Sequence, residues 1–315
     1  MPELPEVQTI VDDLNKKIIG RRIIDVWFDA PKIITIIFAD KRGLIRGTTR
    51  NFKKIFNDKI KGLKIADVKR RGKNILIYLA KTQNLTPKTY LLLIHQKLTG
   101  HLLCGKWQMA NRKAISLIKG PLEEKVNNYI RLIFYLDNGW QLGLSDLRKF
   151  AKVLFGSKEE IEKLPDLVKI GPEPLDKSFK VGKFIETLRQ AQGKRKIKQV
   201  LMDQEVIAGI GNIYSDEILW QAKIHPFKKA NELTTNELKS LYAAMRQILK
   251  KAVKLRGTST SDYRDTEGRS GVYAKVRYVY QREGEKCYRC QALIKRVKIG
   301  GRSSRFCPAC QRLKP

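Results

Sequence analysis

Four cysteines near the end of the chain have the spacing of a metal site. They form the pattern Cys287-x2-Cys290-x16-Cys307-x2-Cys310, and a fifth cysteine, Cys104, lies far outside it. Each close pair brings two thiolates to one side of a tight turn, and two such turns joined by a hairpin close a tetrahedral zinc site. Because protein ligands fill all four positions, we expect one structural zinc. Disulfides or free thiols are the alternative, which a reducing compartment disfavours.

The segment between the two cysteine pairs is a basic hairpin. Gly300-Gly301 predicts a turn, which places Arg302 near its tip. An arginine in this position can bind a phosphate through its planar fork of donors. A solvated basic loop is the alternative, and the composition of the segment does not decide between the two.

A turn with two glycines lies between two predicted helices. Gly209 and Gly211 allow backbone N–H groups to approach a ligand closely, and Asn212 is a favourable N-cap for a helix beginning at Ile213. A helix N-terminus with exposed amides is an anion site. An ordinary helix connection is the alternative, but basic residues just upstream favour a phosphate clamp. These residues are Lys194, Arg195, Lys196 and Lys198.

The N-terminal residues could act as a covalent catalyst. Removal of Met1, which a small second residue favours, would leave Pro2 with a secondary amine. An α-amino group has a pKa of about 8, so it is near deprotonation at neutral pH. Such an amine attacks an aldehyde-level carbon and forms an iminium. Glu3 and Glu6 stand close by in the sequence. A proline start is common on its own, so its meaning depends on the rest of the chain.

The composition indicates a polyanionic partner. The 315 residues include 64 Lys+Arg against 31 Asp+Glu, a net charge of +33. Dispersed Lys and Arg neutralise phosphates, which favours nucleic acid. An anionic membrane surface is the competing partner, but it calls for one amphipathic basic helix. No apolar run reaches about 18 residues, which excludes a membrane-spanning helix. The acidic start is not a signal peptide, so we expect a cytosolic protein.

Hydrophobic periodicity predicts the elements that position these groups. Residues 5–18 have apolar side chains at helical spacing, and short apolar or alternating runs between residues 23 and 155 indicate strands. The clearest runs are Ile33–Phe38, Ile75–Leu79, Leu91–Ile94, Ile130–Leu136 and Val153–Phe155. We therefore predict a β-sandwich with a leading helix, interrupted by a long polar loop over 104–128.

The second half of the chain has a different pattern. Proline and glycine over 165–182 predict a linker, and residues 257–271, rich in Gly, Ser, Thr and Asp, predict a mobile loop. Helical patterns occupy four segments: 183–191, 195–203, 213–222 and 235–254. We expect an α+β multidomain chain with a β-sandwich domain at 1–164, a helical domain at 183–271 and a zinc ribbon at 272–315.

Six motifs follow one another along the whole chain. They are Pro2-Glu3-Leu4-Pro5-Glu6-Val7, Arg71-Gly72-Lys73, Asp146-Leu147-Arg148-Lys149-Phe150, Gly171-Pro172-Glu173-Pro174-Leu175, Gly209-Ile210-Gly211-Asn212-Ile213-Tyr214 and the four-cysteine tail. Together they resemble the bacterial formamidopyrimidine-DNA glycosylases, 8-oxoguanine repair enzymes with an N-terminal proline and a helix–two-turns–helix motif. The resemblance implies a base excision repair enzyme that acts on double-stranded DNA containing oxidised bases, with a helix–two-turns–helix middle domain.

The resemblance also implies catalytic roles. Pro2 is the nucleophile that attacks C1′ of the damaged nucleotide, and Glu3 is the acid/base group for base loss and sugar-ring opening. Lys73 transfers a proton in β-elimination, and Arg302 binds phosphate and supports δ-elimination. For Lys73 an edge-strand lysine is the alternative, because it directly precedes the predicted strand.

Further residues correspond to DNA contacts of the family. Lys194 and Asn212 match phosphate contacts around the helix–two-turns–helix motif. Lys149 stands where relatives have an arginine, and Tyr129 stands near the position of their DNA-contacting histidine. The resemblance therefore places all four among the DNA-binding residues.

Three residues match the groups that fill the duplex after a nucleotide has been flipped out. Leu98 and Phe150 correspond to wedges, and Arg148 corresponds to the residue that recognises the cytosine opposite the lesion. For Leu98 and Phe150, core packing is the alternative. The loop over 257–271 matches the segment that folds over the flipped base.

Two other functions compete with this interpretation. A non-enzymatic DNA-binding protein would use the same basic surface and ribbon, but it needs neither Pro2, Glu3 nor Lys73. An endonuclease VIII-type enzyme removes oxidised pyrimidines and typically begins Pro-Glu-Gly-Pro-Glu, whereas this chain has Leu4 as the third residue of that run. We therefore expect a monomeric purine-lesion glycosylase and lyase of the bacterial cytosol.

Overall fold

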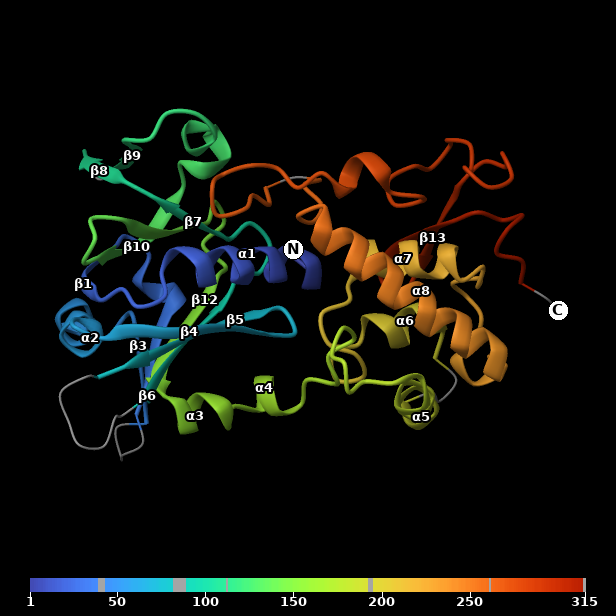
Figure 1. Cartoon of the computed structure of the whole chain (residues 1–315), viewed down its shortest axis with the longest axis horizontal. Helices are drawn as coiled ribbons and strands as arrows, with labels where there is room; N and C mark the ends of the chain where they lie inside the picture. The colour runs from blue at the N-terminus through green and yellow to red at the C-terminus, as the bar shows by residue number, and fades with distance from the viewer. Residues whose placement is uncertain (39–42, 82–88, 112, 192–194, 261, 314–315) are drawn as a thin grey trace. The chain divides into compact units, whose positions relative to one another are not determined.

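The computed structural model describes residues 1–38, 43–81, 89–111, 113–191, 195–260 and 262–313. The chain divides into two compact units, each formed by separate segments (Figure 1). Unit 1 consists of Met1–Pro2, Glu6–Val168 and Arg256–Gly271. Unit 2 consists of Glu3–Pro5, Lys169–Leu255 and Val272–Pro315. Lys194, a predicted phosphate contact, lies outside the described residues.

Helix α1 (Leu4–Lys17) confirms the predicted leading helix. Val7, Ile10 and Leu14 lie on one face of it and are fully buried, as their spacing of three and four residues predicts. Glu6 in the first turn and Lys16 and Lys17 in the last turn have the charges that the helix dipole favours.

Two sheets share the core of unit 1 with α1, as expected of the predicted sandwich. The antiparallel sheet has the order β1 (Ile23–Phe28), β10 (Ile130–Leu136), β11 (Gln141–Ser145), β7 (His101–Gly105). The larger sheet has the order β3 (Leu44–Arg46), β2 (Ile34–Ile37), β12 (Lys152–Ser157), β6 (Thr89–His95), β5 (Asn74–Ala80), β4 (Lys64–Arg71). The β12–β2 pair is parallel and joins strands far apart in the sequence.

The prediction of one long polar loop over 104–128 is wrong. This segment contains the end of β7, the paired strands β8 (Trp107–Ala110) and β9 (Lys113–Ser116), and two short 3-10 turns, Pro121–Glu123 and Lys125–Asn127. Trp107 and Leu122 are buried in a second small core with Leu103 and Ile133. The polar composition of the segment reflects its solvent-facing side, whereas a few apolar residues are enough to fix it on the sheet.

Shorter elements complete unit 1. They are a 3-10 turn at Pro31–Ile33, α2 (Phe52–Ile60), α3 (Lys158–Glu162) and α4 (Pro165–Val168). The predicted linker therefore begins with a helical turn. The described residues of 256–271 contain no long helix or strand, in agreement with the loop predicted over 257–271. They pack within unit 1, although the sequence pattern grouped them with the helical domain.

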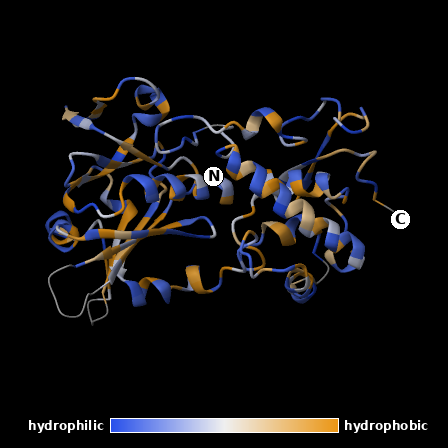
Figure 2. Cartoon of the chain, viewed as in Figure 1, coloured by the Kyte–Doolittle hydropathy of each residue, from blue (hydrophilic) through white to orange (hydrophobic). Residues whose placement is uncertain are grey.

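Unit 2 is built on helices and a hairpin that lies between the two cysteine pairs. Its helices are α5 (Val181–Ala191), α6 (Ile197–Met202), α7 (Asn212–Gln221) and α8 (Thr235–Lys254), with 3-10 turns at Ala230–Glu232 and Tyr273–Val276. Hydrophobic and hydrophilic residues alternate along α8, the pattern of a helix with one buried face (Figure 2). The hairpin consists of β13 (Lys295–Ile299) and β14 (Arg302–Phe306). No helix among the described residues is long and apolar enough to cross a membrane.

Candidate active site and metal centre

The carboxylate of Glu3 binds the N-terminus of α7. One oxygen accepts the backbone N–H groups of Gly211 at 2.7 Å and Tyr214 at 3.3 Å, and the other accepts that of Ile213 at 2.8 Å. Glu3 is 3 % exposed. An unpaired helix N-terminus binds anions, and here the anion is a side chain of the same unit. These bonds fix the orientation of a buried carboxylate directly beside Pro2 in the chain.

This arrangement corrects the prediction of a phosphate clamp at the glycine turn. The amides that were expected to face a phosphate are occupied by Glu3, and α7 begins at Asn212 with Gly211 as its N-cap. Among the upstream cations, Lys198 is buried, and Arg195 forms an ion pair with Asp203 at 2.7 Å. Only the sequence proximity of these cations suggested a common role.

Lys198 and Asp216 form a buried ion pair at 2.5 Å, with side chains 1 % and 0 % exposed. Burial lowers the pKa of Lys198 and raises the pKa of Asp216, and the pairing opposes both shifts. Asp216 also accepts the Ser304 hydroxyl at 2.6 Å and the Arg305 backbone N–H at 3.0 Å. The pair therefore ties α6 and α7 to strand β14.

Asn212 has only part of its side-chain amide satisfied. The side chain hydrogen-bonds the hydroxyl of Tyr280, whereas its buried Oδ1 has no partner among the described residues. The two ends of such an amide are interchangeable in assignment, so one polar atom remains for a ligand. The Arg305 guanidinium lies 4.9 Å from the centre of the Tyr280 ring. Tyr280 is therefore in contact with both Asn212 and Arg305.

Arg302 lies where the sequence predicts, at the start of β14 directly after the hairpin turn. Gly300 and Gly301 have φ of +54° and +74°, a left-handed backbone that glycine adopts without strain. The Arg302 side chain is exposed. Because Asp216 holds the same strand two and three residues further on, the tip is anchored on α7 while its arginine faces solvent.

The four predicted cysteines come together. Their Sγ atoms all lie within 4.8 Å of one another, with 3.3 Å between Cys290 and Cys307 and 4.0 Å between Cys287 and Cys310. Ligands about 2.3 Å from a tetrahedral zinc are about 3.8 Å apart, so the cluster fits that ion. The Trp220 indole and the Arg289 backbone N–H each point to the Cys287 sulfur at 3.4 Å. Cys104 is buried elsewhere, in unit 1.

In unit 1, Pro2 is buried at the start of the chain and Lys73 is 7 % exposed in the turn between β4 and β5. Lys73 lies close enough to influence His95 at the end of β6. Burial, Lys97 and Lys73 together lower the pKa of His95 to about 4. Lys73 is therefore a buried lysine. It precedes β5, which lies between β4 and β6 in the sheet, so the alternative of an edge-strand lysine is wrong.

The predicted wedges are solvent-exposed. Leu98 and Phe150 are 41 % and 52 % exposed, which excludes core packing for both. Arg148 and Lys149 are exposed too, and the Arg148 guanidinium lies 4.6 Å from the centre of the Phe150 ring. Arg148 and Phe150 are therefore exposed neighbours whose side chains are in contact.

Buried Asp146 organises the turn that carries these groups. Its carboxylate accepts the backbone N–H groups of Arg148 at 3.2 Å and Ala151 at 2.7 Å. It also accepts the Thr99 hydroxyl, and Thr99 follows Leu98 directly. The two exposed apolar residues thus stand on turns that share one buried carboxylate.

Tyr129 is half-buried and lines a cavity of about 490 Å³. The same cavity is lined by Thr99, Leu147, Asp262 and Arg264. Tyr129 therefore lies beside both the Asp146 turn and the segment 256–271.

Comparisons with known proteins match the whole chain. Three family models apply: the formamidopyrimidine-DNA glycosylase N-terminal domain at 1–153, the formamidopyrimidine-DNA glycosylase H2TH domain at 170–264, and the zinc finger found in FPG and IleRS at 284–313. The formamidopyrimidine-DNA glycosylase of Desulforamulus reducens is 38 % identical over 315 residues, which is 100 % of both chains. The chain belongs to the formamidopyrimidine-DNA glycosylase family.

Solved structures of a second family member agree with this assignment. A Lactococcus lactis variant bound to DNA containing Fapy-dG matches with a TM-score of 0.78 and 32 % identity, over 99 % of this chain and 100 % of the other. The wild-type Lactococcus lactis enzyme with DNA containing an oxidised pyrimidine matches with a TM-score of 0.77, 32 % identity and the same coverage. The glycosylase fold, the helix–two-turns–helix domain and a zinc finger with one structural zinc are therefore shown for this chain.

Sequence reasoning missed several residues of this glycosylase. Tyr280, which bonds Asn212, was not identified, and Lys198 was given a surface role although it is buried. Tyr280 has no signal in the sequence, because it lies in a stretch with several aromatic residues. For Lys198, the signal was its place one position after Ile197 on a short helix in which Ile197, Val200 and Leu201 are all buried.

Proposed function

We propose that this glycosylase removes oxidised purines, 8-oxoguanine and formamidopyrimidines, from duplex DNA and then cleaves the strand at the abasic site. The observation that carries the proposal is the position of Glu3, a buried carboxylate oriented by three backbone N–H groups, directly next to Pro2. A protein that only binds DNA needs no such group. The Lactococcus lactis relative bound to Fapy-dG DNA supports the purine substrate.

In the proposed mechanism, the amine of Pro2, freed by removal of Met1, attacks C1′ of the damaged nucleotide. The N-glycosidic bond breaks and the base departs with a proton, while Glu3 transfers the proton that opens the sugar ring. The resulting iminium acidifies C2′. Loss of the C2′ proton, assisted by Lys73, expels the 3′ phosphate in β-elimination. Arg302 binds phosphate and supports the second elimination, which expels the 5′ phosphate.

The remaining predicted residues are assigned to DNA binding. We propose that Asn212, Lys149 and Tyr129 contact the DNA backbone, and that Lys194 does so as well. Leu98 and Phe150 fill the space that the flipped nucleotide leaves, and Arg148 recognises the opposite base. Their exposure supports these roles, because a buried side chain could not enter a duplex.

We also propose the domain division into a catalytic domain at 1–164, a linker at 165–182, a helix–two-turns–helix domain at 183–271 and a zinc ribbon at 272–315. The packing of 256–271 within unit 1 adds that this segment serves the catalytic domain. We place the protein, as a monomer, in the bacterial cytosol with its DNA substrate, since the relatives are bacterial enzymes.

Borohydride trapping tests the proposal. Wild-type protein and a duplex with 8-oxoguanine opposite cytosine should give a covalent complex linked through residue 2, together with strand cleavage. Pro2→Gly should greatly reduce both, while binding to the duplex persists. Trapping at the wild-type level in the variant would place the nucleophile elsewhere.

A second substrate class has specific support. The Lactococcus lactis relative has been crystallised with an oxidised pyrimidine, so this chain is a candidate for such lesions too. Single-turnover excision of a hydantoin or a thymine glycol, measured beside 8-oxoguanine, ranks the two classes. We expect 8-oxoguanine to be faster, in agreement with Leu4 at the N-terminus.

A further inference from the structure

Within the segment 256–271, one arginine links two positions that lie nine residues apart, Arg256 itself and Asp265. Arg256 donates to Asp265 from Nε at 2.9 Å and from Nη2 at 2.7 Å. The same guanidinium donates to Asp13 of α1 from Nη1 at 3.2 Å and from Nη2 at 2.6 Å. Arg256 thus joins both ends of the stretch 257–264 and fastens them to α1, the helix that follows Pro2 in the chain.

The two carboxylates that Arg256 joins are nearly buried, so this ion pair is not a solvent-exposed one. The Asp13 and Asp265 side chains are 9 % and 2 % exposed, and Arg256 is 43 % exposed. The two carboxylates raise the pKa of the Arg256 guanidinium, which remains charged. Without that charge, two nearly buried carboxylates would share one site with no counter-ion, which is strongly unfavourable.

Each carboxylate also accepts further hydrogen bonds from the same segment. Asp265 accepts the N–H groups of Glu267 and Arg269, both at 2.9 Å, which shapes the turn that follows it. Asp13 accepts the Thr266 hydroxyl at 2.9 Å. Loss of the Arg256 charge would therefore disturb the turn at 265–269 as well as the link between residues 256 and 265.

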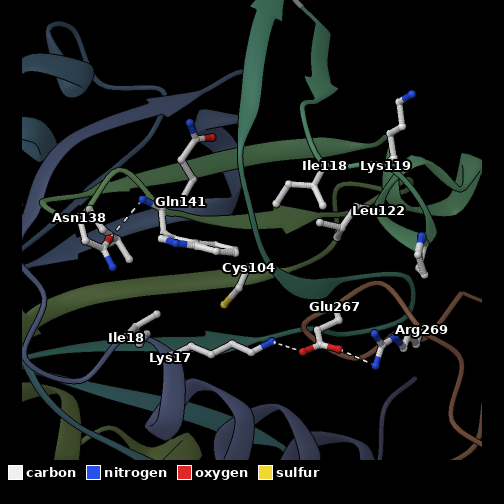
Figure 3. A pocket seen from close by; sticks show the side chains of 13 residues that line it. Lys17, Ile18, Cys104, Ile118, Lys119, Leu122, Asn138, Gln141, Glu267 and Arg269 are labelled. Carbon is white, nitrogen blue, oxygen red and sulfur yellow. Dashed lines mark hydrogen bonds and ion pairs between the residues drawn. The ribbon is translucent and has the colours of Figure 1, made fainter.

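Additional contacts hold the segment along the length of α1. Glu6 accepts the Thr258 N–H at 2.7 Å, and Lys17 bonds Glu267 at 3.0 Å. Figure 3 shows the second contact, with Glu267 between Lys17 and Arg269 beside a cavity of about 420 Å³. Arg256 precedes the stretch 257–264 and bonds Asp265, which follows it, so it links the two ends of the stretch directly.

The backbone of Arg256 indicates that its side chain is needed there. It has a φ of +60°, a left-handed conformation that non-glycine residues adopt at a cost of about 1 kcal/mol. The next residue, Gly257, also has a positive φ of +78°, and a Cβ there would stand 2.8 Å from the Glu6 side chain. Two consecutive left-handed residues bend the chain sharply towards α1.

We propose that Arg256 is a positioning residue that presets the described residues of 257–264 for contact with a flipped base, the role that the family resemblance implies for this segment. This inference rests on the proposed function. It requires that excision of an oxidised base depends on Arg256, because the base must be held while its glycosidic bond breaks. Cleavage at an abasic site does not depend on it, because no base is present to hold.

Two substrates measured under single turnover test the proposal. They are a duplex with 8-oxoguanine opposite cytosine and the same duplex with a preformed abasic site. Arg256→Met keeps the side-chain length and the backbone preference but removes the charge. We expect excision to be about tenfold slower, with abasic cleavage within about twofold of wild type. Equal loss on both substrates, or no loss on either, would overturn the proposal.

Two further variants show whether a slower excision rate comes from loss of the Arg256 contacts or from a general loss of positive charge. Arg256→Gly removes the side chain but suits the left-handed backbone, so it should show the same selective loss, and full excision by this variant would also refute the role. Arg21→Gln removes an exposed arginine outside this segment, and it should leave both rates unchanged. Wild-type protein that cleaves abasic DNA but does not excise 8-oxoguanine would instead defeat the proposed function.

Discussion

Glu3 and Gly211 are in such close contact that no side chain fits between them. A Cβ on residue 211 would stand 2.5 Å from the Glu3 carboxylate, whose oxygen accepts the Gly211 N–H at 2.7 Å. Gly211 has a φ of −134°, which any residue adopts. The requirement for glycine is therefore the approach of the carboxylate and not the backbone conformation.

Gly211→Ala should displace the Glu3 carboxylate. We expect base excision and abasic cleavage both to slow by about 10- to 100-fold, because a shift of about 1 Å in a catalytic group has effects of this size. Single-turnover kinetics on the two substrates measure the change. Gly182→Ala is the matched control: a Cβ there meets nothing within 4 Å, so activity should be retained. An unchanged Gly211→Ala variant would show that the orientation of Glu3 is unimportant.

Removal of the metal should weaken DNA binding without unfolding unit 1. The four-cysteine cluster anchors the hairpin that carries Arg302, and a structural zinc supplies much of the folding energy of such a small unit. Metal analysis should give about one zinc per chain. Cys290→Ser should lose the metal and bind DNA less tightly, whereas Cys104→Ala should keep both. Full activity of a metal-free protein would contradict this role.

Arg148 should make excision depend on the opposite base. An orphaned cytosine presents acceptors at O2 and N3 to an arginine fork, whereas adenine presents an amino donor. A good bidentate contact discriminates by about 1–3 kcal/mol. Wild-type protein should therefore remove 8-oxoguanine faster opposite cytosine than opposite adenine, and Arg148→Ala should reduce that ratio. A cytosine preference that persists undiminished in the variant would assign the recognition to another residue.

His95 should make the protein less stable in acid. Its pKa is about 4 in the folded protein, lowered by burial, Lys97 and Lys73, against about 6.5 when unfolded. Because the unfolded chain binds the proton first, the contribution is present above pH 6.5 and is lost as the pH falls towards 4. From about pH 7.5 to about pH 5 the loss is about 2 kcal/mol. Urea unfolding should show a correspondingly smaller change in His95→Gln, and an identical pH dependence in both proteins would exclude this role.

The sequence predicts best those elements whose burial follows a regular period. Strand β10 matches its predicted bounds, Ile130–Leu136, and α1 differs from 5–18 by one residue at each end. In α1 the apolar spacing reflects one buried face. In β10 the apolar run reflects burial on both faces, with Leu132 and Phe134 in one core and Ile133 in the other. The hairpin β8–β9 lacks such a signal, because only Trp107 and Ala114 of its strands are buried.

In the candidate site too, the sequence predicts local features better than contacts between distant residues. The cysteines and Arg302 could be placed from spacing, since each depends on a local turn. The bonds from Glu3 to α7 could not, because they join residues more than 200 positions apart, and Gly211 alone suggested only a generic anion site. Lys198 was misassigned for a related reason: a run of cations looks uniform in sequence, whereas its partner, Asp216, is visible only in the folded unit.

The discontinuity of the two units sets an order for folding during synthesis. Unit 1 includes Arg256–Gly271, so the ribosome releases residues 1–168 before the last segment of the unit has been made. During that time Asp13 has no Arg256 with which to form its ion pair. At about 5–20 residues per second, the missing segment follows about 5–20 seconds later. The Glu3 carboxylate likewise has no backbone N–H groups to bind until α7 has been synthesised. A nascent chain halted before residue 256 would therefore contain both sheets but an unpaired Asp13, and the protein should gain its repair competence only near the end of translation.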